Sequence, residues 1–139
     1  MRIMAIDYGD AHTGIAISDP TGFLAGFTTV ITAYRPEIVA EQVAALAKEH
    51  GAEELVLGHP KNMDGTRGPR AEKAEAMAEL LKEATGLPVV LWDERRTTID
   101  AHQILMTGGK NAKKRKKVVD AVAASLILEG YLTYKKSHL

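Results

Sequence analysis

The sequence predicts an α/β fold in which helices cover both faces of a mixed five-stranded sheet. In the first part of the chain, β-branched and aromatic runs alternate with tight turns, which is typical of an antiparallel meander. In the remainder, strand-like and helix-like segments alternate, and this pattern requires parallel pairing with right-handed crossovers. The predicted order is three strands, helix, strand, helix, strand and two helices. The 139 residues suit a single domain spanning residues 1–139.

Three strands are expected before residue 33. They cover residues 2–7, 14–18 and 23–32. A polar turn at 9–13 separates the first two strands, and Asp19-Pro20-Thr21-Gly22 is a clear turn signal between the second and third. Connections this short favour antiparallel neighbours.

The later elements are predicted from helical spacing of apolar residues and from glycines and prolines at the boundaries. A helix is expected to begin at Pro36 and to stop at Gly51, and others are expected over 71–84, 98–106 and 118–134. The fourth and fifth strands are placed at 55–58 and 87–92, and polar loops at 59–68 and 107–112.

Composition excludes several classes of protein. The chain has no cysteine, so disulfides, thiol nucleophiles and thiolate metal sites are excluded. No apolar run approaches the roughly 20 residues that a membrane span needs, and no signal peptide is expected. These features favour a cytoplasmic protein without a membrane partner. The 18 basic and 18 acidic residues balance, but the segment 110–117 holds six cations and no acid, so it is a candidate polyanion-binding patch.

Acidic residues end or follow three of the predicted elements. Asp7 ends the first strand, Asp93 and Glu94 follow the fifth, and Asp120 lies near the start of the last predicted helix. A buried carboxylate is costly without a partner, and a divalent cation is a natural partner for several carboxylates. The pattern predicts a two-metal phosphodiesterase site that binds Mg²⁺ or Mn²⁺ through Asp7, Glu94 and Asp120.

Each of these acids also has a simpler interpretation. Asp7 could start a turn, and Asp120 could stabilise the helix dipole. Neighbouring residues of a strand point to opposite faces, so only one of Asp93 and Glu94 can face the metals. Glu94 is favoured for its longer reach, and Asp93 is kept as the alternative.

Cationic and polar residues near these acids are candidate substrate contacts. Arginine can bind phosphate through two parallel hydrogen bonds, and a cationic loop can hold neighbouring phosphates. The alternative for the basic run 113–117 is an ordinary solvated surface. The candidate contacts are Asn62, Arg70, Arg95, Lys114 and Arg115. The five histidines show no metal-ligand spacing. His12 and His59 lie in the two candidate site loops, where either could be a proton shuttle, but both are expected to be solvent-facing loop residues.

Four segments carry a resemblance to a known family. They are Ile6-Asp7-Tyr8-Gly9 with Gly14-Ile15-Ala16-Ile17-Ser18-Asp19, then Gly58-His59-Pro60-Lys61-Asn62-Met63-Asp64-Gly65-Thr66, then Asp93-Glu94-Arg95-Arg96-Thr97-Thr98, and finally Lys117 through Leu128. Through them the chain resembles the YqgF/RuvX family of Holliday junction resolvase-like proteins, also described as pre-16S rRNA nucleases. The family often has Arg or Lys where this chain reads Asp10-Ala11-His12-Thr13, and an apolar residue where it has His59.

The resemblance implies an RNase H-like fold with sheet order 3-2-1-4-5 and a site built from Asp7, an acid of the Asp93-Glu94 pair, and Asp120. It also implies a structured RNA substrate, an rRNA precursor. Two alternatives stay open. One is a resolvase acting on branched DNA, which requires a homodimer, so a monomer in solution would count against it. The other is a non-catalytic RNA-binding factor, against which the intact set of acids counts. An actin-like sugar kinase is excluded by length, since that architecture needs two such domains.

Overall fold

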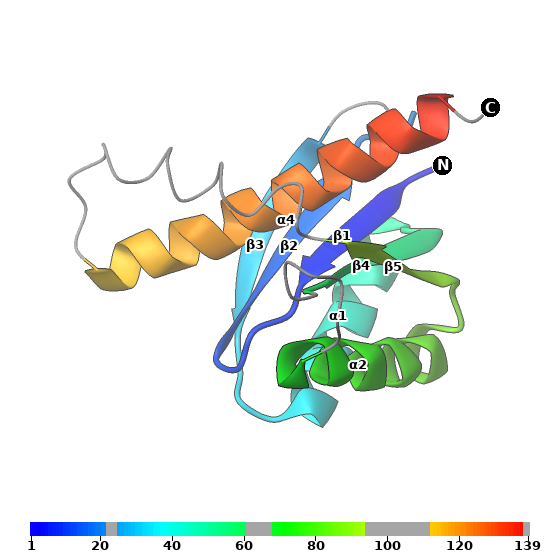
Figure 1. Cartoon of the computed structure of the whole chain (residues 1–139). Helices are drawn as coiled ribbons and strands as arrows, with labels where there is room; N and C mark the ends of the chain where they lie inside the picture. The colour runs from blue at the N-terminus through cyan, green and yellow to red at the C-terminus, as the bar shows by residue number, and fades with distance from the viewer. Residues whose placement is uncertain (22–24, 61–67, 94–111, 138–139) are drawn as a thin grey trace.

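A computed structural model of the chain shows a five-stranded mixed sheet with the order β3-β2-β1-β4-β5. The structure describes residues 1–21, 25–60, 68–93 and 112–137, and for residues 25, 112–120 and 137 it describes the backbone alone. Strand β2 pairs antiparallel with both β1 and β3. Strand β4 pairs parallel with both β1 and β5. The predicted meander and the predicted parallel half are therefore both confirmed (Figure 1).

The elements follow one another in the predicted order. Their bounds are β1 Ile3–Asp7, β2 His12–Ser18, β3 Ala25–Thr32, α1 Pro36–His50, β4 Glu54–His59, α2 Pro69–Thr85, β5 Val89–Asp93 and α4 Ala112–Ser137. The helix expected over 98–106 lies outside the described residues. Strand β2 begins two residues earlier than predicted, so His12 and Thr13 are strand residues rather than turn residues.

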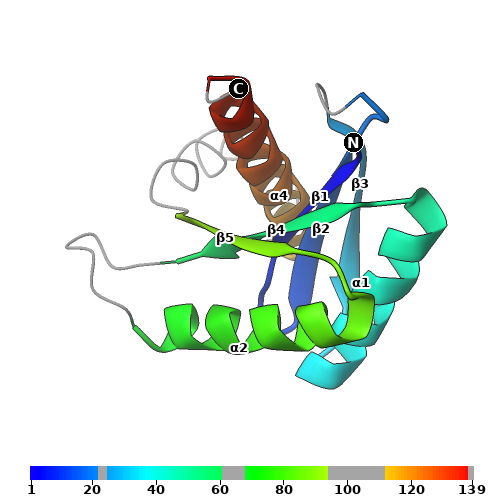
Figure 2. The ribbon, with the colours of Figure 1, turned by 90° about the vertical axis from the view of Figure 1, so that its right-hand side faces the viewer.

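Helices cover both faces of the sheet, as Figure 2 shows edge-on, with α1 and α2 on one side and α4 on the other. Alternate strand residues therefore feed two separate cores. The α1–α2 face buries the larger cluster, which includes Met4, Ile6, Ile15, Leu55 and Leu57. The α4 face buries a smaller cluster, which includes Ile3, Ala5, Ala16, Val56 and Ile127.

The boundaries of α1 follow from its sequence. Pro36 occupies the first turn, where its missing N–H would have no partner in any case. Gly51 ends the helix in the left-handed region at φ 69°, and its N–H donates to the carbonyl of Lys48. Both predicted signals are confirmed.

The last helix differs from the prediction at its start. Helix α4 begins at Ala112, six residues before the predicted 118, so the basic run 113–117 is helical and not a loop. Alanine, lysine and arginine are all strong helix formers, and this propensity outweighs the loop-like appearance of a charge run. Asp120 is therefore the ninth residue of the helix, two turns in, where the N-terminal dipole has little effect.

Within the described residues, no helix is both long enough and apolar enough to span a membrane.

Candidate functional site

Three parallel strands end at the same edge of the sheet. Asp7 ends β1, His59 ends β4 and Asp93 ends β5. In parallel α/β sheets, this carboxyl edge is where ligands generally bind. The face of the sheet to which each side chain belongs then decides which groups it can contact.

The Asp7 side chain belongs to the α4 face of the sheet. Ile3 and Ala5, its alternate neighbours on β1, both lie in the cluster under α4. Asp7 is in register with Gly14 on β2, and on the other side β4 carries Gly58, one residue beyond the Ile6–Leu57 pair. The strand positions on both sides of Asp7 therefore carry no side chain.

Asp93 belongs to the opposite face. On β5, Val90 and Trp92 pack against the α4 cluster, whereas Val89 packs against the α1–α2 cluster. Asp93 lies four residues after Val89, so strand alternation assigns it to the same face, and it is in register with His59. Strand alternation therefore assigns the two aspartates that end β1 and β5 to different faces of the sheet. Asp93, on the edge strand, also lines a pocket of about 320 Å³ with Trp92 and with Tyr131 and Tyr134 of α4.

His59 does not match the prediction of a solvent-facing loop residue. It is the last residue of β4 and is only 8% exposed. Its Nε2 lies 2.8 Å from Oε2 of Glu75 on α2. Because His59 has the parity of Leu55 and Leu57, its ring enters the α2 layer, and Glu75 supplies the polar partner that a buried ring needs. His12 is a half-buried strand residue at the start of β2 and not the predicted loop residue; its Nδ1 lies 3.2 Å from Oγ1 of Thr32.

The other predicted site residues are placed only in part. Glu94, Arg95 and Asn62 lie outside the described residues. Asp120, Lys114 and Arg115 lie in α4, which packs across the face of the sheet that carries Asp7, but only their backbone is described. Among the described side chains, no three His, Asp or Glu groups gather as a metal-binding cluster.

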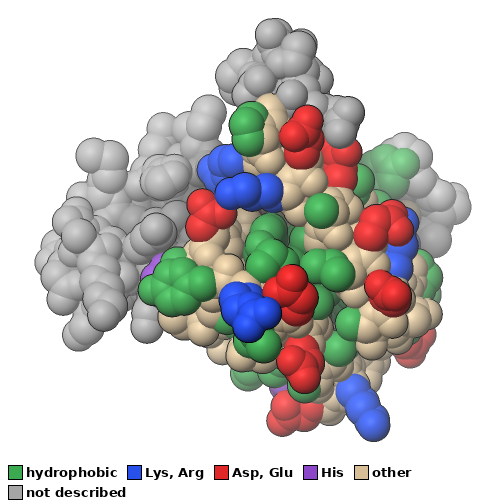
Figure 3. Space-filling model, turned by 90° about the horizontal axis from the view of Figure 1, so that it is seen from below, with side chains coloured by type: hydrophobic (Ala, Val, Ile, Leu, Met, Phe, Trp, Pro, Cys, Tyr) green, Lys and Arg blue, Asp and Glu red, His purple; other side chains and the backbone are tan. Residues whose placement is uncertain are grey.

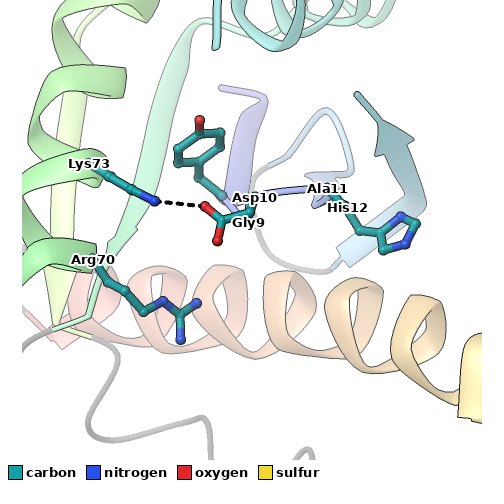
Figure 4. Close-up of a pocket in the computed structure, with 7 residues that line it drawn as sticks. Gly9, Asp10, Ala11, His12, Arg70 and Lys73 are labelled. Carbon is teal, nitrogen blue, oxygen red and sulfur yellow. Dashed lines mark hydrogen bonds and ion pairs between the residues drawn. The ribbon is translucent and has the colours of Figure 1, made fainter. Parts of the chain in front are cut away.

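A cavity of about 360 Å³ opens beside the end of β1, on the α2 side. It is lined by residues that link β1 to β2 and by two residues from the start of α2: Tyr8, Gly9, Asp10, Ala11, His12, Arg70 and Lys73. Figure 4 shows the Arg70 and Lys73 side chains extending from α2 toward this connection, with Lys73 Nζ 3.1 Å from Oδ1 of Asp10. Arg70 thus lies at the cavity, in the first turn of α2.

Sequence reasoning missed most of this cavity. Lys73 and Asp10 are 63 residues apart, and each alone is an ordinary surface charge. Tyr8 was not singled out, yet burial, reinforced by the charge of Asp10, raises the pKa of its hydroxyl. The sequence offers one signal for this cavity. Lys73 is a cation one turn inside the helix that follows the glycine-rich segment at 65–68.

The sheet order, the helices on both faces and the acid at the end of β1 define an RNase H-like fold. Two solved structures share it. One is Thermus thermophilus RuvC in complex with a Holliday junction substrate, with TM-score 0.63 and 14% identity, covering 99% of this chain and 96% of that one. The other is the fowlpox virus Holliday junction resolvase, with TM-score 0.56 and 16% identity over the whole of both chains.

The chain belongs to the RuvX family, whose model, described as Holliday junction resolvase, matches residues 1–134. A relative from Halothermothrix orenii, named "Putative pre-16S rRNA nuclease", is 46% identical over 135 residues, covering 97% of this chain and 96% of the relative. A Listeria monocytogenes serotype 4b protein of the same name is 47% identical over 134 residues, covering 95% and 97%.

Proposed function

We propose that this protein is a divalent-metal-dependent nuclease that hydrolyses phosphodiester bonds in a precursor of 16S rRNA. The observation that carries the proposal is the Asp7 carboxylate at the end of β1, on the face that α4 crosses, with glycines at both flanking strand positions. The names of the relatives supply the substrate class.

The metal would be held by Asp7, Glu94 and Asp120. The glycines beside Asp7 put no side chain next to its carboxylate, and carboxylate oxygens are the ligands that Mg²⁺ and Mn²⁺ prefer. Asp120 precedes Ala124 by one helical turn, and Ala124 is fully buried against the sheet. That spacing supports the assignment of Asp120 to the side of α4 that faces Asp7. When bound, the metal would neutralise charge on the scissile phosphate.

Strand parity supports Glu94 over Asp93 as the third ligand. Asp93 shares its face with His59 and α2, away from Asp7. Trp92, two positions before Glu94 in the sequence, packs under α4. We therefore propose Glu94 as the third metal ligand and assign no catalytic role to Asp93.

Substrate binding is assigned to the cations around this edge. Arg70 lines the cavity beside β1, and Lys114 and Arg115 belong to the first two turns of α4. Arg95 and Asn62, which follow β5 and β4 in the sequence, complete the proposed set. Arginine suits the role because its planar guanidinium matches two phosphate oxygens at once.

The test is cleavage of two labelled substrates, the 5′ end of a 16S rRNA precursor and a four-way DNA junction, each with Mn²⁺ and with chelator. We expect Mn²⁺-dependent cleavage of the RNA, abolished by Asp7→Asn, with RNA binding retained. Asp93→Asn is the matched control, because it makes the same change at the end of the neighbouring parallel strand but on the other face. It should keep cleavage.

Each other outcome changes the assignment. Cleavage of the junction alone would support the resolvase, which the family description and the RuvC-like fold favour as the second candidate and which requires a dimer. RNA binding without cleavage of either substrate would support a binding factor. Loss of cleavage in Asp93→Asn but not in Asp7→Asn would move the site to the α2 face.

A further inference from the structure

We propose that the cavity between the β1–β2 connection and the start of α2 binds a backbone phosphate of the nucleic-acid strand, on the opposite side of the sheet from Asp7. This inference rests on the proposed function, because it assumes a nucleic-acid substrate. It adds a second contact point, built from Arg70 and Lys73, so that the strand would cross the carboxyl edge of the sheet from the α4 side to the α2 side.

The charge of the cavity comes from α2. Within the described part of the chain, the Arg70 guanidinium has no hydrogen-bond or ion-pair partner. Lys73 lies one turn further along the same helix, and its side chain is 58% exposed. Figure 4 shows both side chains reaching toward the residues that follow β1, whereas the His12 ring points away from them. Two cations that converge on one hollow favour an anionic ligand.

The backbone of α2 adds to this preference. The helix has 17 residues and begins at Pro69, which has no N–H of its own, after Gly68, which offers no side-chain cap to the N–H groups that follow. Uncapped N–H groups at a helix start carry partial positive charge and bind phosphate readily. The cavity thus joins two full charges and one helix terminus, and all three favour the same ligand.

Among the described residues that line the cavity, Asp10 is the only acid, and its charge provides a test of the proposal. Its carboxylate lies 3.1 Å from Lys73, and the pair is exposed, so the pair itself adds little stability. A phosphate that enters the cavity must compete with this carboxylate for Lys73 and is repelled by it. Removing the charge of Asp10 should therefore strengthen phosphate binding. If Asp10 only supported the local structure, the same change would not strengthen it.

The rest of the α1–α2 side offers no comparable cluster among the residues described. In Figure 3, which views this side from below, acidic and basic side chains are interspersed. Lys82, in the last turn of α2, lies 3.3 Å from Glu79 and far along the helix from Arg70. Lys82→Ala therefore removes a cation from the same helix but outside the cavity, which makes it a matched control.

The experiment measures binding of a fluorescent single-stranded RNA to the full chain by anisotropy, in chelator and over a series of salt concentrations. Chelator separates this test from cleavage, so failure of the nuclease proposal and failure of this one are distinguishable. We expect Arg70→Ala and Lys73→Ala each to weaken binding about fivefold or more and to lower the salt slope by about one. Asp10→Asn should tighten binding, and Lys82→Ala should change it less than about twofold.

Inorganic phosphate, added at constant ionic strength, distinguishes a strand phosphate from a free ion. It should displace the RNA more effectively from wild type than from Arg70→Ala. If Arg70→Ala and Lys73→Ala behave like Lys82→Ala, and Asp10→Asn does not tighten binding, the proposal is overturned. If phosphate protects the wild-type protein against thermal unfolding but not Arg70→Ala, while RNA affinity is equal in both, the cavity binds a small anion and the strand contact is refuted.

Discussion

Glu54 is a buried carboxylate that joins the beginning of β4 to the end of α4. Its side chain is 11% exposed, and it accepts hydrogen bonds from the Tyr131 hydroxyl and from Lys135 Nζ, the latter at 3.1 Å. The partners are 77 and 81 residues away in the sequence, so these bonds hold α4 against the sheet. Tyr131→Phe removes one donor and keeps the ring, which packs edge-to-face with Trp92.

The expected cost follows from the charge on the acceptor. A hydrogen bond to a charged group contributes about 1.5–3 kcal/mol, and Lys135 still serves Glu54 in the variant, so we expect a loss of about 1.5–2 kcal/mol. For 139 residues, an unfolding entropy of about 2.1 cal/mol/K per residue converts this loss to a fall in Tm of about 5–7 °C.

The same contact predicts a pH dependence. Burial, and then the hydrogen bond to Glu54, raise the pKa of Tyr131 above its ordinary value. The unfolded chain releases this proton near pH ~10, while the folded protein retains it. The stability that the hydroxyl contributes is therefore complete below pH ~10 and is lost as the pH rises further.

Urea unfolding, followed by the fluorescence of Trp92, the single tryptophan, measures both effects. Tyr34→Phe is the control, since it makes the same change at a residue that is 76% exposed, and it should alter stability by less than about 0.5 kcal/mol. Equal losses in the two variants would refute the reasoning. So would a gap between wild type and Tyr131→Phe that stays constant from pH ~9 to pH ~11.

Two further variants test the ends of β1 and β4. In Gly9→Ala, the new Cβ would clash with the carbonyl oxygen of His12, so the β1–β2 connection must shift. Anisotropy should then show weaker RNA binding with an unchanged circular dichroism spectrum, and wild-type affinity would contradict this. Glu75→Ala leaves the buried His59 ring without its partner and should cost about 1–3 kcal/mol in urea unfolding, whereas Glu75→Gln keeps a hydrogen-bonding group and should cost less. Equal losses in these two variants would show that the hydrogen bond is not what matters.

The arrangement of the strands could be predicted from the sequence because each rule involved is local. Short turns impose antiparallel pairing in the first half, and intervening helices impose parallel pairing in the second. Period-two alternation likewise put Ile3, Ala5 and Asp7 on one face, and the structure places the first two under α4. The end of α1 at Gly51 was predictable because a glycine after a helical pattern permits a left-handed residue.

The parts that could not be predicted depend on contacts between distant segments. His59 resembles a loop residue because a polar side chain follows an apolar strand, and only the packing of α2 brings Glu75 to it. Asp10 and Lys73 meet for the same reason. The start of α4 was misjudged differently: a run of five cations suggested solvated loop, although each residue in it favours a helix.

The end of β1 ties the two proposed functions of this edge together. Asp7 faces α4, and the cavity begins at the next residue, Tyr8, which packs against the α1–α2 cluster. Asp7, the last residue of β1, and Tyr8, the residue after it, thus lie toward opposite faces of the sheet. A strand of nucleic acid that crosses this edge would place its scissile phosphate by Asp7 and another phosphate by Arg70. Variants on the α4 face should then lower kcat, and variants in the cavity should raise KM. Gly9→Ala, which moves the connection itself, should change both.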